Sequence, residues 1–271
     1  MPELPEIETT RLGITPFVVQ QTIMSAIVRH PQLRVPVTPN LSTYCSGKVI
    51  LGISRRAKYL VLHLSEGHML IHLGMSGHLR IVNEHTSFGK HDHIDLCFTS
   101  GSILRYNDPR RFGLWIYLTE NPLQHHLLTH LGPEPLTDGF NGDYLYCRAR
   151  NKTQCIKSFI MNNTIVVGVG NIYAAESLFL AGIHPKTAAG TVSREQMLRL
   201  SEHIKNVLQQ AIKAGGTTLR DFYAADGRPG YFSNELKIYG RQNKPCYTCK
   251  TRIEAISIAG RNSAFCPRCQ P

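Results

Sequence analysis

Four cysteines near the end of the sequence have a spacing that is typical of a metal site. Cys246 and Cys249 form one Cys-x-x-Cys pair, and after sixteen residues Cys266 and Cys269 form a second. Each pair can present two sulfurs from one tight turn, so the two pairs together can surround a tetrahedral zinc ion. Because four protein ligands leave no open coordination position, we predict one structural zinc ion and no catalytic metal.

The residues between the two cysteine pairs predict a β-hairpin. Residues 252–258 and 263–265 are expected to be its strands, with a tip at 259–262 that carries Arg261. An arginine at the tip of a zinc-clamped hairpin could contact a nucleic acid, and a solvated turn arginine fits the same spacing equally well.

The first residues of the sequence can supply amine and carboxylate chemistry. Removal of Met1 would leave Pro2 with a secondary amine, which can attack a sugar aldehyde carbon to give an iminium ion. An iminium is cationic without a proton and promotes elimination, and Glu3 and Glu6 are suited to proton transfer. Taken alone, however, these residues more commonly mark the start of a helix.

Two basic segments and one glycine-flanked loop could contact DNA. Residues 55–58 are basic and precede an expected strand, residues 108–113 form a basic turn with Phe112, and Met75 lies in the loop 71–77. Methionine and phenylalanine beside arginines match the wedge residues of proteins that unstack a base, although each alone fits core packing.

Asn171 follows the glycines of Gly168-Val-Gly170 and is predicted to be the N-cap of a helix. The segment resembles the start of a dinucleotide fingerprint, but Tyr173 replaces the third glycine and the context is helical. The free N–H groups of that helix could hold one phosphate, and capping alone is the commoner use of such an asparagine.

These candidate residues fall in two regions that differ in the spacing of their apolar residues. Short apolar runs separated by turn signals fill about 20–119, after an expected helix at 5–15, and predict a sandwich or barrel-like pair of sheets. Residues 131–139 look like a linker. Beyond it, apolar residues three and four apart predict helices near 143–150, 152–162, 171–182 and 193–213. Ser193 and Gln196 form a possible capping box, and Gly215-Gly216 ends the last helix.

The composition favours a polyanionic partner. The 30 lysines and arginines exceed the 19 aspartates and glutamates, giving a net charge of +11. No run approaches the ~20 apolar residues of a membrane helix, and the acidic start is unlike a signal peptide. We therefore expect a soluble intracellular protein, in which the four remaining cysteines are reduced, packed thiols; these are Cys45, Cys97, Cys147 and Cys155.

Five segments, in chain order, resemble bacterial formamidopyrimidine-DNA glycosylase. They are residues 1–6, 108–113, 167–174 and 226–232 and the four-cysteine finger. The resemblance implies an α+β fold with three domains. These are an N-terminal β-sandwich domain at 1–132, a helical helix-two-turn-helix domain at 140–232 and a zinc finger at 237–271.

The resemblance also implies an activity. It predicts a monomeric, cytoplasmic, nucleoid-associated enzyme of base excision repair that binds double-stranded DNA with damaged bases or abasic sites. The enzyme would excise 8-oxoguanine and formamidopyrimidines and then cleave the abasic strand by β,δ-elimination.

Residue roles follow from the same resemblance. Pro2 would form the Schiff base, Glu3 would assist opening of the sugar ring, and Glu6 would position the N-terminus and a water molecule. The phosphates around the lesion would be held by Lys58, His72, Asn171 and Arg261. The gap left by the flipped nucleotide would be filled by Met75, Arg110 and Phe112, with Arg110 on the orphaned cytosine. The loop over the everted base would contain Thr217, Thr218, Arg220, Phe222 and Tyr223.

The sequence departs from the family pattern at a few positions and leaves rival interpretations open. Asn162 replaces a common aspartate, Lys250 replaces a common glycine, and Thr217-Thr218 lie in a variable stretch. An endonuclease VIII-type enzyme for oxidised pyrimidines and a non-catalytic damaged-DNA-binding protein are the alternatives. A zinc-dependent nuclease is disfavoured, because no His/Asp cluster leaves an open metal site.

Overall fold

The computed structural model describes residues 2–217 and 232–271. These residues form two compact units. Unit 1 contains the described residues of 1–129 and 215–231, and unit 2 contains those of 130–214 and 232–271. Residues 215–217 therefore belong to the same unit as the N-terminal part of the chain.

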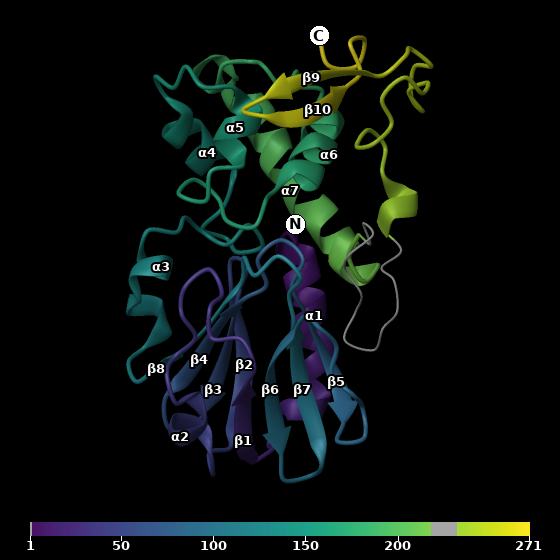
Figure 1. Ribbon diagram of the computed structural model, residues 1–271. Helices are drawn as coiled ribbons and strands as arrows, with labels where there is room; N and C mark the ends of the chain where they lie inside the picture. Colours follow the sequence, from purple (N-terminus) through teal and green to yellow (C-terminus); the bar gives the residue numbers. More distant parts are fainter. Residues whose placement is uncertain (1, 218–231) are drawn as a thin grey trace. The chain divides into compact units, whose positions relative to one another are not determined.

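Unit 1 is built on two four-stranded antiparallel sheets (Figure 1). One sheet has the order β1-β6-β7-β5 and the other the order β2-β3-β4-β8. The strands are β1 (Ile23–Val28), β2 (Ile50–Arg56), β3 (Tyr59–Leu64), β4 (His68–His72), β5 (His78–Asn83), β6 (Asp92–Phe98), β7 (Ser102–Asn107) and β8 (Leu114–Leu118).

One apolar core joins the two sheets of unit 1. Phe98 and Tyr106 of one sheet and Trp115 of the other are fully or almost fully buried in it. The long helix α1 (Leu4–Val18) contributes Ile7 and Ile14 to the same core. The remaining helical segments of unit 1 are short: α2 (Leu41–Cys45), η1 (Pro122–Gln124) and α3 (His126–Thr129). Burial of whole sheet faces makes this unit a β-sandwich.

Unit 2 is helical, with a hairpin near its end (Figure 1). Its helices are α4 (Gly142–Ala149), α5 (Ile156–Ile160), α6 (Asn171–Ala181), η2 (Ala189–Thr191), α7 (Arg194–Lys213) and η3 (Phe232–Glu235). The hairpin consists of β9 (Glu254–Ile258) and β10 (Arg261–Phe265). The hairpin packs on α6 through a small core that includes Ala175, Phe179 and Ala264.

Most of the predicted elements are present, and one helix is shorter than predicted. The capping box of Ser193 and Gln196 begins α7, and Gly215 and Gly216 adopt positive φ after its end, as predicted. The helix predicted at 152–162 is reduced to α5. The preceding residues are extended instead, because Cys155 pairs with Ala188 and the Gln154 carbonyl accepts a hydrogen bond from Ala189.

The cysteine prediction is correct for some residues only. Cys45 and Cys97 are buried free thiols, but Cys147 is exposed on α4 and Cys155 is half-buried. Cys147 is therefore not a packed thiol, because it lies on the solvent side of an amphipathic helix. No helix among the described residues has the length and apolar character needed to cross a membrane.

Candidate functional site

The N-terminal segment is fixed by one buried carboxylate. Pro2, Glu3 and Glu6 are all buried at the start of α1. Glu6 Oε2 accepts a hydrogen bond from the Glu3 backbone N–H at 2.8 Å, and its Oε1 accepts one from the Thr217 N–H at 2.9 Å. Glu6 therefore joins the predicted nucleophile segment to the start of the predicted lesion-covering loop, although 211 residues separate them.

Lys58 occupies a two-residue turn between β2 and β3. Ala57 in this turn has a φ of 54°, and its carbonyl accepts a hydrogen bond from the Arg55 guanidinium at 3.0 Å. The Lys58 side chain is only 8% exposed, so a buried cation lies at this end of the hairpin. A buried cation is placed to attract an anionic group, because desolvation strengthens the interaction.

His72 lies at the same end of the sheet as Lys58, since it is the cross-strand partner of Tyr59. Its Nδ1 accepts a hydrogen bond from the Gly74 N–H at 2.9 Å, which leaves the ring proton on Nε2. Burial, and then the positive charges of Lys58 and Arg34, lower the pKa of His72 to about 4. His72 is therefore a neutral imidazole that can donate one hydrogen bond from Nε2.

Asp108 holds two loops together and was not singled out from the sequence. Its side chain is completely buried and accepts hydrogen bonds from Ser76 Oγ at 3.0 Å, Tyr106 OH at 3.0 Å and the Gly113 N–H at 2.9 Å. One carboxylate thus connects the loop around Ser76 with the loop that ends at Gly113. In the sequence, Asp108 is marked only as the first residue of the basic turn 108–113.

The predicted wedge residues gather beside these two loops. Met75 and Phe112 are 36% and 47% exposed, and the Arg110 guanidinium lies 4.8 Å from the centre of the Phe112 ring. Met75, Phe112 and His72 line a hollow of about 300 Å³ together with Arg34, which the sequence did not indicate. Exposed apolar side chains beside arginines suit insertion into a base stack.

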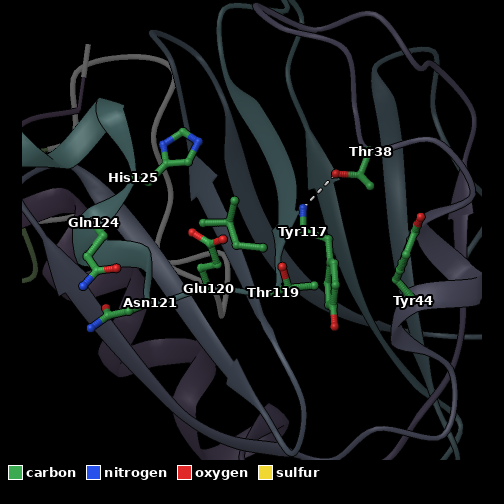
Figure 2. Close-up of a pocket in the computed structure, with 9 residues that line it drawn as sticks. Thr38, Tyr44, Tyr117, Thr119, Glu120, Asn121, Gln124 and His125 are labelled. Carbon is green, nitrogen blue, oxygen red and sulfur yellow. Dashed lines mark hydrogen bonds between the residues drawn. The ribbon is translucent and has the colours of Figure 1, made fainter.

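A further hollow of unit 1, of about 310 Å³, contains none of the predicted site residues (Figure 2). Tyr44 and Tyr117 stack there with their ring centres 5.2 Å apart, and the Tyr117 N–H donates to Thr38 Oγ1 at 2.8 Å. The hollow lies at the last residues of β8 and the start of η1, whereas His72 pairs with Leu114 at the first residue of β8.

In unit 2, a buried lysine connects α6 to the hairpin. Lys157 is 1% exposed, and its Nζ donates to Asn171 Oδ1 and to Ser263 Oγ, each at 2.7 Å. Asn171 Nδ2 in turn donates to the Asn262 carbonyl at 3.2 Å. These bonds fix the first residue of α6 next to the residues that follow Arg261, and Lys157 was missing from the predicted site.

Two local predictions in this part of unit 2 are wrong. Asn171 is the first helical residue and Gly170 is the N-cap, because the Asn171 side chain is engaged by Lys157 and Asn262 instead of the helix N–H groups. Arg261 is not at the hairpin tip but is the first residue of β10, paired with Ile258. The tip consists of Ala259 and Gly260, both with positive φ, as in a two-residue turn.

The four cysteines form a cluster that fits one zinc ion. Their sulfurs all lie within 4.8 Å of one another, with Cys246 and Cys269 at 3.9 Å and Cys249 and Cys266 at 3.4 Å. Two sulfurs on one tetrahedral zinc are about 3.8 Å apart, given Zn–S bonds of about 2.3 Å. Lys250, which departs from the usual glycine, has a φ of 64° in the first knuckle. The predicted zinc site is confirmed.

Three family models match the chain in order. They are the formamidopyrimidine-DNA glycosylase N-terminal domain at 1–115, the H2TH domain of the same glycosylase at 131–223, and the zinc finger found in FPG and IleRS at 243–271. The chain belongs to the formamidopyrimidine-DNA glycosylase family. The predicted family, fold class and DNA glycosylase activity are therefore confirmed.

Individual relatives agree with these models over their full length. The formamidopyrimidine-DNA glycosylase of Legionella pneumophila strain Lens is 60% identical and that of Hydrogenovibrio crunogenus 54% identical; each alignment covers 100% of this chain, and 99% and 96% of the relatives. Among solved structures, the Lactococcus lactis Fpg with DNA containing an abasic site is 36% identical with a TM-score of 0.92, covering 99% of both chains.

The predicted site residues are divided between the two units. Pro2, Glu3, Glu6, Lys58, His72, Met75, Arg110, Phe112 and Thr217 belong to unit 1, and Asn171, Arg261 and the four cysteines belong to unit 2. Thr218, Arg220, Phe222 and Tyr223 lie outside the described residues. The roles of all these residues, other than zinc binding, and the three domain boundaries remain predictions.

Proposed function

We propose that this glycosylase is bifunctional. It excises oxidised purines, namely 8-oxoguanine and formamidopyrimidines, through a Schiff base at Pro2, and it then cleaves the abasic strand by β,δ-elimination. The observation that best supports this proposal is the position of the Glu6 carboxylate. It accepts hydrogen bonds from the backbone N–H groups of Glu3, which directly follows Pro2, and of Thr217, and so connects these two segments. A nucleophile needs such fixed positioning, because small displacements cost large factors in rate.

The ligands of similar proteins support the choice of substrate. A Lactococcus lactis Fpg mutant, 35% identical with a TM-score of 0.92, was solved with DNA containing Fapy-dG. A structure of MutM, 34% identical with a TM-score of 0.90, contains carbocyclic 8-oxo-G DNA. Both alignments cover 99% or more of each chain. An oxidised purine and the abasic site it leaves are therefore the substrates we assign to this chain.

The chemistry starts when Met1 has been removed and Pro2 has a free secondary amine. Pro2 is buried, and its secondary amine acts as the nucleophile in the uncharged form. The Pro2 nitrogen bonds to C1′ while the bond from C1′ to the base breaks and the base leaves with a proton. Glu3 protonates the ring oxygen, which opens the sugar and leaves an iminium between Pro2 and C1′.

The iminium then withdraws electrons from the sugar. Loss of a proton from C2′ expels the 3′ phosphate, and a second elimination expels the 5′ phosphate. Lys58, His72, Asn171 and Arg261 hold phosphates around the lesion in this scheme. Met75, Arg110 and Phe112 fill the space of the everted nucleotide, and Arg110 contacts the orphaned cytosine.

Borohydride trapping tests the proposal. The full-length protein is incubated with a duplex carrying 8-oxoguanine opposite cytosine, and the reduced adduct is digested and mapped by mass spectrometry. We expect one covalent adduct at Pro2. A variant that keeps one extra residue before Pro2 is the matched control, because it turns the amine into an amide while leaving the rest of the chain unchanged.

Other outcomes point to the rival functions. DNA binding of normal strength without any adduct would show a binding protein. Faster trapping on a duplex with an oxidised pyrimidine would show an endonuclease VIII-type preference. An adduct that maps to a lysine would keep the glycosylase and overturn the role of Pro2.

A further inference from the structure

A pair of histidines faces each other across the β3–β4 hairpin, away from the predicted active-site residues. His63 and His68 are cross-strand partners next to the turn at 65–67, and their Nδ1 atoms lie 3.1 Å apart. Lys58 and His72 are at the opposite end of the same hairpin, next to Tyr59. This pair of imidazoles takes no part in the proposed glycosylase reaction.

The separation of the two nitrogens matches that of two ligands on one metal ion. Two nitrogens bonded to one metal at about 2.1 Å, at an angle between about 90° and 109°, are about 3.0–3.4 Å apart. Because directly paired strand residues carry both rings, little side-chain freedom is lost on binding. Both residues are only partly buried, so an ion can reach them from solvent.

Ser54 on the neighbouring strand β2 fixes the useful tautomer of His63. Its Oγ lies 2.7 Å from His63 Nε2. When Nε2–H donates to that oxygen, His63 Nδ1 carries a lone pair that accepts a hydrogen bond from His68 Nδ1, and a metal ion would replace that shared proton between the two nitrogens. An exposed serine beside two histidines also resembles a hydrolase relay. The N–H groups of β3 are paired in the ladder with β2 and β4, however, and a sheet face offers no oxyanion hole.

The charges around the pair permit a cation in an otherwise basic protein. Burial lowers the pKa of both histidines, and for His63 the charge of His68 adds to the effect. Among the described residues, no lysine or arginine is a cause of either shift. Lys48 is engaged by Glu66 at 3.1 Å. The neutral form of each imidazole offers a nitrogen lone pair to a metal ion.

We propose that His63 and His68 form a second metal site, for a divalent late transition metal ion such as Ni²⁺, Cu²⁺ or Zn²⁺. Imidazole ligands suit these ions. Among the residues that the structure describes, no third histidine, cysteine or acidic side chain joins the pair. The remaining coordination positions therefore belong to water, and the ion exchanges freely, unlike the zinc of the four-cysteine finger.

Calorimetric titration with Ni²⁺ tests the site. The protein carries its finger zinc, verified by metal analysis, and the exposed Cys147 is replaced by serine to remove a competing thiol. We expect one Ni²⁺ per chain, with affinity reduced at least about ten-fold in His63→Gln and in His68→Gln, and by a smaller factor in Ser54→Ala. His85→Gln, at an 87% exposed histidine, is the control and should bind as the parent does.

The result can contradict the proposal in two ways. Equal affinity in the parent and both histidine variants would show that Ni²⁺ binds elsewhere, and loss in only one of them would show a single-imidazole contact. Thermal unfolding with and without Ni²⁺ is compared within each variant, so that altered folding does not obscure the outcome. Pro2 trapping is measured in parallel and should be unchanged, because this inference is independent of the glycosylase reaction.

Discussion

In unit 1, buried carboxylates hold the backbone beneath the candidate site residues, whereas in unit 2 the β9–β10 hairpin is held by thiolates and a buried lysine. Asp108 and Glu6 each accept hydrogen bonds from two separate segments of unit 1. In unit 2, Lys157 and the four-cysteine cluster hold the hairpin in place. The difference follows from size, because a sandwich has a large core, while a hairpin of two five-residue strands has almost none.

We expect the two groups of site residues to lose their fixed positions under different treatments. Unit 1 should respond to loss of hydrogen-bond acceptors and to acid, since Asp108 and Glu6 are buried acceptors and His72 is a buried neutral imidazole. The hairpin of unit 2 should respond to loss of the metal, because the small core around it cannot replace a bound ion.

Removal of zinc should have the largest effect. Structural zinc sites contribute about 10–16 kcal/mol of binding free energy to folding, so Cys266→Ala or a strong chelator should unfold the hairpin. Arg261 would then lose its fixed position, and we expect DNA affinity to fall at least about ten-fold. A chelator titration removes the zinc stepwise, and fluorescence anisotropy with a lesion duplex measures the DNA affinity at each step.

The exposed cysteine Cys147 supplies the control for the zinc experiment. Cys147→Ser removes a thiol outside the cluster and should leave the zinc content and DNA affinity unchanged. Full DNA affinity after complete zinc loss would show that the hairpin folds without its metal. The contrast between the two units would then be incorrect.

The second largest effect is expected for Asp108→Asn in unit 1. The amide nitrogen would face donors that now bond to the carboxylate, from Tyr106, Gly113 or Ser76. Buried donors without partners cost about 1–3 kcal/mol each, so we expect a loss of about 2–4 kcal/mol in the free energy of unfolding of unit 1. Urea unfolding measures it, and DNA binding should weaken as the Phe112 loop loosens.

Glu84→Gln is the matched control, since it neutralises an acidic residue of the same unit whose side chain is 71% exposed. Its free energy of unfolding should stay within about 0.5 kcal/mol of the parent. If Asp108→Asn unfolded at the same urea concentration as this control, the carboxylate would not be what holds the two loops.

Local patterns predicted the parts of the site that neighbouring residues determine. The cysteine pairs, the hairpin between them and the capping box of α7 each depend on residues within one turn or one hairpin, and all are present. The short apolar runs at 59–64, 69–73, 93–98 and 114–118 predict strands, and they correspond to β3, β4, β6 and β8. The other strands of the sandwich were not assigned individually, because runs such as β2 mix glycine, serine and arginine with apolar residues.

Contacts between distant segments could not be predicted in this way. Lys157 meets Ser263 across 106 positions, and Glu6 meets Thr217 across 211. Nothing in the neighbourhood of either residue indicates its partner. Asn171 illustrates the consequence: its type and place predict an N-cap, and a long-range bond to Lys157 draws the side chain away.

Of the three predicted effects, the loss of stability in acid should be the smallest, and it should act through His72 in unit 1. The pKa of His72 is lowered to about 4 by burial and by Lys58 and Arg34, against an ordinary value of 6.5. The unfolded chain therefore takes up a proton first as the pH falls. The contribution of His72 to stability is complete above about pH 6.5 and is lost progressively between about 6.5 and 4, at up to about 1.4 kcal/mol per pH unit.

The measurement is the difference in the free energy of unfolding between the parent and His72→Asn, taken from pH 7.5 to 4.5. Asparagine keeps an acceptor near the Gly74 N–H but carries no titratable ring. Other groups with lowered pKa values, among them His78 and Asp95, titrate in both proteins and cancel in the difference. The parent should therefore lose more stability than the variant, while His85→Asn should follow the parent. Parallel pH curves for the parent and His72→Asn would mean that the pKa of His72 is the same in the folded and the unfolded chain. His72 would then become a cation below about pH 6.5, and the neutral hydrogen-bond donor that we assign to this buried position would be incorrect.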